Sequence, residues 1–390
     1  MDQQEGNSQA PSRREALLKL LKERRLGYVP ATTYGVDRFS HEWMARDPSF
    51  RRVLEHTDRF DHIFVLHLSY YASFGVTDVL GLWDPGALEQ KVHQEGGATH
   101  YHMTLHTPRG DLTANYTENE GMRTVWRHDH LMKTDGDIDR FLSAPFVPNP
   151  PNIEAFERTR EALGERGVME VETPTPLCLV VENMPYDQFM VRALQDPARV
   201  EALLDRASEL IARWLESLLS AGFGPVFRFF GPEYAAPPMM SPKLFRKVVV
   251  ERDQPLIEQV HRHGGFVRYH CHGPIARIVD DMLALGVDMT DPCEPPPSGD
   301  IPFRELANRV GRNMILMGNI QLDAIERAEP EEIDRQVAEA IEAVGDRAPL
   351  ILCTTAFPVT SPLPEVTERN LIQFLLSADK HGGRARGAQA

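Results

Sequence analysis

From about residue 170 onward, short apolar runs alternate with longer amphipathic segments. The apolar runs have the length of buried strands and cover 176–181, 226–230, 266–270, 287–289, 314–317 and 350–353. The segments between them place apolar residues at helical spacing over 198–221, 241–263, 274–285, 303–310, 330–344 and 364–378. Strands that alternate with helices in this way predict a parallel sheet covered by helices, that is, an α/β protein.

The number of these units favours a closed barrel. Six strand–helix units, with one or two earlier strands, match the composition of a (β/α)8 TIM barrel, and this is the fold class that we predict. A doubly wound open sheet is the alternative. However, no G-x-G-x-x-G or Walker-type loop follows any predicted strand, which disfavours the nucleotide-binding versions of that fold.

The first third of the chain is less regular and predicts additions in front of the barrel. Ser12 is placed to cap a helix through about Arg25, and an extended run follows at 28–33. Residues 98–128 alternate enough to predict antiparallel strands. We expect a single barrel domain over 13–380, with disordered polar ends at 1–12 and 381–390.

Composition then narrows the class of function. The chain has 390 residues, of which 42% are hydrophobic, and a net charge of -15, which disfavours nucleic acid as a partner. No stretch approaches 18 uninterrupted apolar residues, so no membrane span is expected. Four scattered cysteines are too few for a disulfide framework, and the N-terminus lacks an apolar signal region. We therefore expect a cytoplasmic protein.

In a barrel, catalytic groups follow the carboxyl ends of the strands. The strongest signal at such an end is RYHCHGPI, where His270 and His272 fall on one face of the strand and Cys271 on the other. Two imidazoles at a barrel mouth can chelate a divalent ion, and zinc prefers histidine and cysteine ligands. Cys353, at the end of a late strand, is placed to supply a third ligand. The alternative is that these histidines are ordinary satisfied or surface residues.

Two carboxylates are candidates for completing the site. Glu233 ends the run FRFFGPE, and Glu294 begins the loop EPPPSGD, whose three prolines would hold it rigidly. A plain proline-rich turn is the alternative for the second of these loops.

Further histidines lie in the irregular first third. His100, His102 and His106 occur in HYHMTLH, and His128 and His130 occur in RHDH. They suggest a second metal site, but they lie away from the predicted barrel mouth. We expect them to be strand or loop histidines, with a place along the substrate cleft as the alternative.

From about residue 137 to 378 the chain resembles the uroporphyrinogen decarboxylase superfamily, including its cobalamin-linked methyltransferase branches. The passages that resemble it are GPEYAAPPMMSPKLF, GGFVRYHCHGPI, DPCEPPPSGDI, LMGNIQ and LILCTTAFPVTSPL. The resemblance implies a (β/α)8 barrel with N-terminal additions and a cleft at the barrel mouth. The decarboxylase branch fits poorly, because its arginine-rich clamp for porphyrin carboxylates is missing from the matching region GYVPATTYGVDRFSHEW.

The methyltransferase branch is more similar, and its zinc site implies the ligands His270, His272 and Cys353. That branch has a cysteine at the position of His272, and a neutral imidazole there makes the zinc a stronger Lewis acid. The resemblance therefore implies zinc-dependent transfer of a methyl group from the oxygen or nitrogen of a small methylated substrate to a corrinoid. Glu233 completes the metal set or handles the proton, and Glu294 is the second candidate.

The chain shows no cobalamin-binding motif, so the corrinoid would belong to a partner protein. Homodimers are common for such barrels. The alternatives are a decarboxylase-type lyase, a metal-dependent hydrolase, and a barrel without catalytic activity that serves in binding or assembly. The sequence does not identify the substrate.

Overall fold

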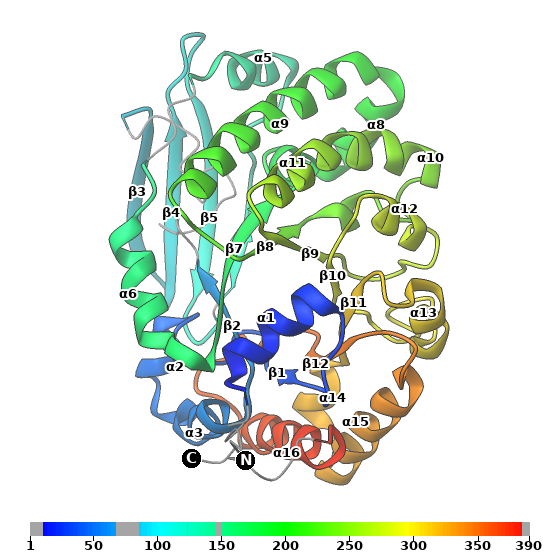
Figure 1. The fold of residues 1–390 in the computed structure, drawn as a ribbon. Coiled ribbons are helices and arrows are strands. Elements are labelled where there is room, and N and C mark those ends of the chain that lie inside the picture. Colours follow the sequence, from blue (N-terminus) through cyan, green and yellow to red (C-terminus); the bar gives the residue numbers. More distant parts are fainter. Residues whose placement is uncertain (1–10, 68–85, 123, 146–149, 384–390) are drawn as a thin grey trace, which may run out of the picture.

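Eight parallel strands form a nearly closed ring with helices around it (Figure 1). The structure is a computed structural model that describes residues 11–67, 86–122, 124–145 and 150–383. The strands follow the order β1-β12-β11-β10-β9-β8-β7-β2. The backbone N–H of His62, next to β2, donates to the carbonyl of Ala31 in β1 over 2.8 Å, which joins the two ends of the sheet. The predicted TIM barrel is confirmed.

The elements have these bounds. The barrel strands are β1 (Ala31–Thr32), β2 (Ile63–His67), β7 (Gly167–Pro174), β8 (Val226–Phe230), β9 (Phe266–His270), β10 (Met289–Asp291), β11 (Ile315–Ile320) and β12 (Leu350–Thr354). The α-helices are α1 (Arg13–Glu23), α2 (Glu42–Arg46), α3 (Arg51–Phe60), α5 (Asp135–Ser143), α6 (Ile153–Leu163), α7 (Pro176–Val181), α8 (Tyr186–Gln195), α9 (Pro197–Ser220), α10 (Pro242–Phe245), α11 (Glu251–Arg262), α12 (Val279–Ala284), α13 (Phe303–Val310), α14 (Leu322–Arg327), α15 (Pro330–Val344) and α16 (Glu365–His381). Short turns of 3₁₀ or π-helix are η1 (Pro48–Phe50), η2 (Gly164–Arg166), η3 (Pro232–Tyr234) and η4 (Arg246–Val250).

One predicted strand is wrong. Residues 176–181 form helix α7 because the side chain of Thr175 caps the first turn. Pro176 fits the first turn, where the backbone N–H that proline lacks would have no partner within the helix. The true strand, β7, lies just before it and contains Glu170 and Glu172. Both acids alternate with apolar residues and are buried, so the segment resembles a surface strand although it lines the barrel.

The barrel interior is mostly apolar at its N-terminal end. Alternate strand residues such as Val226, Ile315 and Ile351 pack there in one cluster with the leucines of α1. Ser12 caps α1 with a capping box, as the sequence predicts, and Figure 1 shows this helix lying across the ring of strands. Arg13 donates to the carbonyl of Asp61, just before β2, over 2.9 Å, so α1 closes the N-terminal end.

A second, antiparallel sheet packs beside the barrel in the order β3-β4-β5-β6. Its strands are β3 (Leu88–Glu95), β4 (Ala98–Leu105), β5 (Leu112–Asn119) and β6 (Val125–Arg127). This confirms the antiparallel strands expected within 98–128, whereas β3 was missed because its sequence LEQKVHQE is almost wholly polar. One face, with Met103, Leu105 and Tyr116, is buried in the main core.

The ends of the chain lie mostly outside the described residues, including most of the segments 1–12 and 381–390 that we expect to be disordered. Among the residues that the structure describes, none of the helices combines the length and the hydropathy needed to cross a membrane.

Candidate functional site

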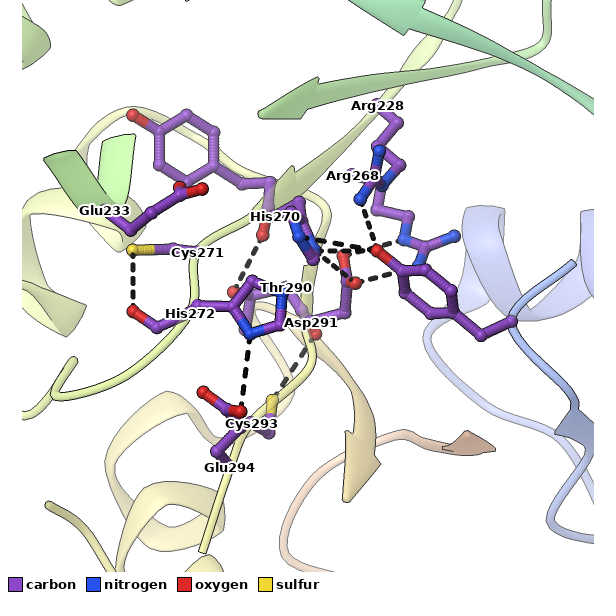
Figure 2. Close-up of polar contacts among 12 residues, drawn as sticks. Arg228, Glu233, Arg268, His270, Cys271, His272, Thr290, Asp291, Cys293 and Glu294 are labelled. Atoms are coloured by element: carbon purple, nitrogen blue, oxygen red, sulfur yellow. Dashed lines mark hydrogen bonds and ion pairs between the residues drawn. The ribbon is translucent and has the colours of Figure 1, made fainter. Parts of the chain in front are cut away.

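The candidate site is centred on His270, the last residue of β9, whose side chain points into the barrel mouth (Figure 2). In the parallel register, His270 lies beside Asp291, the last residue of β10. The imidazole Nδ1 is 2.7 Å from Oδ2 of Asp291. Only 5% of His270 is exposed, and burial lowers its pKa to about 3. The ring is therefore neutral, with Nδ1–H donating to the carboxylate and a lone pair left on Nε2.

Asp291 is held in turn by a buried arginine. Nε and one terminal nitrogen of Arg268 donate to its two oxygens over 2.7 and 2.8 Å. The other terminal nitrogen of Arg268 donates to Glu170 over 3.0 and 3.1 Å. Despite burial, Arg268 and His270 hold the pKa of Asp291 well below its usual range. The carboxylate that orients His270 thus stays ionised and fixed.

A second buried arginine reaches the same imidazole through a tyrosine. Arg228 of β8 pairs with Glu172 and donates to the hydroxyl oxygen of Tyr34. That hydroxyl lies 3.2 Å from Nδ1 and 3.4 Å from Nε2 of His270. Burial raises the pKa of Tyr34, which keeps the phenol protonated.

His272 follows two residues later, and its ring meets that of His270 edge to face, with centroids 4.5 Å apart. Its Nδ1 is 3.3 Å from Oε1 of Glu294, whose Oε2 accepts the Gly273 N–H over 2.6 Å. This contact raises the pKa of His272 and lowers that of Glu294. The predicted carboxylate Glu294 is therefore a direct partner of the second imidazole.

Glu233, which follows β8, lies on the opposite side of the Cys271–His272 segment from Glu294. Figure 2 shows it beside Cys271, with Glu294 below His272. Its Oε2 accepts the backbone N–H of Gly231 over 3.1 Å, and burial raises its pKa while His272 opposes that rise. Of the two candidate carboxylates, Glu233 thus has the raised pKa and Glu294 the lowered one.

A polar cluster beside Glu233 joins the antiparallel sheet to the mouth. The hydroxyl of Tyr234 donates to Glu182, which also pairs with Arg127 of β6 over 2.5 Å. Tyr186 donates to the carbonyl of Tyr234. These contacts fix the loop that follows β8.

Cys353 is placed differently from the two histidines. Its side chain is fully buried in the interior cluster that also contains Tyr34 and α1, and burial raises the pKa of its thiol. His270, His272 and Cys353 do not form a group whose ligand atoms all lie within 4.8 Å of one another. The structure brings together the two imidazoles and places the thiol in the apolar cluster of the barrel interior.

The donor chemistry of the mouth suits a zinc ion. A neutral imidazole whose other nitrogen binds a carboxylate is the usual form of a histidine ligand, because the carboxylate fixes the tautomer and raises ligand basicity. His270 has this arrangement with Asp291, and His272 has it with Glu294. In both rings the carboxylate contacts Nδ1, so Nε2 is the nitrogen left for a metal ion, which would displace the proton favoured on His272 and the Tyr34 contact at 3.4 Å on His270.

Sequence reasoning missed the charged residues behind His270. Glu170, Arg228 and Arg268 are all buried, whereas Asp291 is visible at a strand end and only its contact with His270 was missed. The available signal was a charge at alternate positions of otherwise apolar strands, which indicates a polar barrel interior. Tyr34 gave no such signal, because its loop precedes the regular part of the chain.

The model of the family described as "Uroporphyrinogen decarboxylase (URO-D)" matches residues 128–363. A solved methyltransferase from Methanosarcina mazei has a TM-score of 0.61 at 17% identity, over 95% of this chain and 99% of that chain. A B12-independent methionine synthase from a Shewanella species has a TM-score of 0.46 at 12% identity, over 75% of each chain. No curated protein sequence matches the chain. At these identities, the methyltransferase from Methanosarcina mazei shows a shared fold.

Proposed function

Because the chain belongs to the uroporphyrinogen decarboxylase (URO-D) family, we propose that it is a zinc-dependent methyltransferase of the methyltransferase-like branch. The reaction would move a methyl group between a small methylated substrate and a corrinoid. A separate protein would hold the corrinoid over the barrel mouth. A cytoplasmic location and a homodimeric assembly remain predictions.

The observation that supports this proposal is the pairing of His270 with Asp291 beside His272. The buried, neutral imidazole of His270 is fixed through Nδ1, its Nε2 lies 3.4 Å from the Tyr34 hydroxyl, and His272 lies edge to face with it. His270 and His272 would hold the zinc, and Cys353 would have to approach them to supply the third ligand. When bound, zinc supplies Lewis acidity that polarises the heteroatom carrying the methyl group.

The surrounding side chains would control charge and protons. Asp291 keeps His270 in one tautomer, and Glu294 orients His272. Glu233, whose pKa is raised by burial, would give its proton to the heteroatom as the bond to the methyl carbon breaks and the corrinoid takes the methyl group. Glu294 is the second candidate, but its lowered pKa keeps it ionised, so it would first have to take up a proton.

The buried arginines disfavour decarboxylation of a porphyrin substrate, because they are already paired with acidic residues of the chain. Arg228 and Arg268, the buried arginines next to His270, are paired with the chain's own Glu172, Glu170 and Asp291. A substrate with many carboxylates would have to break these pairs to gain a cationic partner.

The test is an anaerobic assay with zinc-loaded protein, reduced free cobalamin and a panel of methanol, methyl ethers, methylamines and methyl thioethers. Methylcobalamin formation is followed by absorbance. We expect turnover with at least one oxygen or nitrogen compound, loss of turnover in His270→Ala, and retention in His56→Ala, which changes a half-buried histidine of α3 far along the chain from the mouth residues.

Zinc content gives a readout that does not depend on the substrate. His270→Ala and His272→Ala should lose bound zinc while circular dichroism shows an intact fold. Cys353→Ala tests the thiol in the same way, and unchanged zinc would remove it from the ligand set. Hydrolysis of esters or amides without cobalamin would contradict the proposal in favour of a hydrolase.

A further inference from the structure

Two histidines and a glutamate converge on the hairpin formed by β3 and β4, away from the barrel mouth. His93 and His100 occupy directly opposite positions in the antiparallel register. Their rings stack with centroids 4.8 Å apart and an interplanar angle of 10°. Glu95 lies two residues after His93 and so shares its face of the strand. One ligand atom from each of the three lies within 4.8 Å of the other two.

Packing does not account for this convergence. His93 and Glu95 are exposed and His100 is half-buried. The whole of β3 after Leu88 faces solvent, and β3 is the outer strand of its sheet. Because an edge strand has hydrogen-bonding partners on one side only, β3 pairs with a single strand, β4, among the strands that the structure describes.

We propose that His93, Glu95 and His100 bind one divalent transition-metal ion, such as Zn²⁺. Two imidazoles and one carboxylate are a donor set that suits zinc, nickel and copper, and they leave a fourth position open to water or to a ligand from outside. The ion would cross-link β3 to β4. This site goes beyond the proposed function, since it shares no residue with the barrel mouth.

The hairpin site has no sulfur ligand, so its cobalt(II) spectrum should differ from that of a mouth site that includes Cys353. A cobalt(II) ion held by His93, Glu95 and His100 would show ligand-field bands without a thiolate charge-transfer band. A cobalt(II) ion at a mouth site that includes Cys353 would show that band in addition. Failure of one proposal is therefore distinguishable from failure of the other.

The test is calorimetric titration of the full chain with Zn²⁺ alone, in parallel with hydrogen exchange of residues 88–105. His93→Ala, His100→Ala and Glu95→Gln should each weaken the zinc affinity of the hairpin site by at least about tenfold. Even the loss of a residue that only hydrogen-bonds to a metal ligand lowers metal affinity by about this factor. Zinc should slow exchange in the hairpin of the unaltered protein and not in His93→Ala.

The matched control is His106→Ala. His106 is a half-exposed histidine just after β4 that lies near Glu89 and Asp111 but outside the three-residue group. It should bind zinc as the unaltered protein does, and His270→Ala should keep the hairpin event. The proposal is overturned if His93→Ala and His100→Ala titrate like the unaltered protein, if His106→Ala loses the same event, or if zinc leaves hairpin exchange unchanged.

Discussion

Nδ1 of His270 donates to Oδ2 of Asp291 over 2.7 Å, at the ends of two neighbouring parallel strands. The same carboxylate accepts two hydrogen bonds from Arg268. The side chain that orients the candidate ligand is thus also a partner in a buried ion pair, so the site and the stability of the barrel depend on one residue.

Asp291→Asn should damage both properties. The change leaves the buried charge of Arg268 with one partner fewer, and breaking such a pair costs about 3–5 kcal/mol of the free energy of unfolding. The zinc affinity of the mouth should fall by about 10–100-fold, because His270 loses the carboxylate that fixes its tautomer. Urea denaturation and zinc titration measure the two effects.

An exposed pair of the same geometry is the control for this variant. Arg309 donates to both oxygens of Asp280 over 2.9 and 2.8 Å at the surface. Asp280→Asn should lower the free energy of unfolding by no more than about 1 kcal/mol, since solvent screens such pairs. Equal losses in the two variants would contradict the role given to the buried network.

Glu294→Gln should lower the pKa of His272. In the metal-free protein the carboxylate stabilises the imidazolium form and raises that pKa. Removing the charge removes this stabilisation while burial continues to favour the neutral ring. Titration of the imidazole resonances by NMR measures the change, with Glu305→Gln on the surface of α13 as the control. An unchanged pKa in Glu294→Gln would show that the contact is not populated in solution.

Zinc affinity at the mouth should depend on pH for the same reason. Metal binding competes with the proton on His272, so affinity should weaken as the pH falls below the raised pKa of that ring. In Glu294→Gln this weakening should begin at a lower pH.

Asp253→Asn should change how stability depends on pH. Asp253 is fully buried in α11, accepts the hydroxyl of Tyr269 over 2.5 Å and has its pKa raised to about 7. Its folded pKa exceeds the unfolded one, so its contribution is complete below about pH 4 and is lost as the pH rises toward 7. Relative to the unaltered protein, the variant should therefore gain about 4 kcal/mol between these limits, at 1.36 kcal/mol per pH unit. Parallel stability curves for the two proteins over pH 4–8 would contradict this.

Gly231→Ala should disturb the loop that carries Glu233. Gly231 has a φ of 102°, and an added Cβ would lie 2.2 Å from Cβ of Cys178. We expect a loss of more than about 2 kcal/mol in the free energy of unfolding, from backbone strain and overpacking together. Gly264→Ala is the control, because its φ is 76° but nothing lies within 4 Å of the added Cβ. Similar losses in both variants would mean that the contact with Cys178 is unimportant.

Much of the fold could be predicted from periodicity, and the site only in part. The strands 226–230 and 266–270 have the predicted bounds because their apolar runs are closed by Gly or polar residues. The strand β7 could not be recognised, because a barrel lined with Glu170 and Glu172 has the alternation of a surface strand. The His-x-His pattern located His270 and His272 at a strand end, since side-chain alternation is a local property.

The partners of these histidines depend on the tertiary structure. Tyr34 lies 236 positions before His270, and only closure of the ring brings the two together. Asp291 was visible at a strand end, but its contact with His270 follows from the register between β9 and β10. The place of Cys353 in the interior cluster likewise depends on the packing of the closed barrel, which periodicity does not give.

The central claim is that His270 and His272 hold a metal ion at the barrel mouth. Its most direct measurement is anomalous diffraction at the zinc absorption edge from crystals of the zinc-loaded protein. We predict a peak bonded to Nε2 of both imidazoles at about 2.0–2.1 Å, with Sγ of Cys353 at about 2.3 Å if the thiol joins the set. A zinc-loaded crystal with no peak at the mouth, or with a peak bonded to neither imidazole, would contradict the claim.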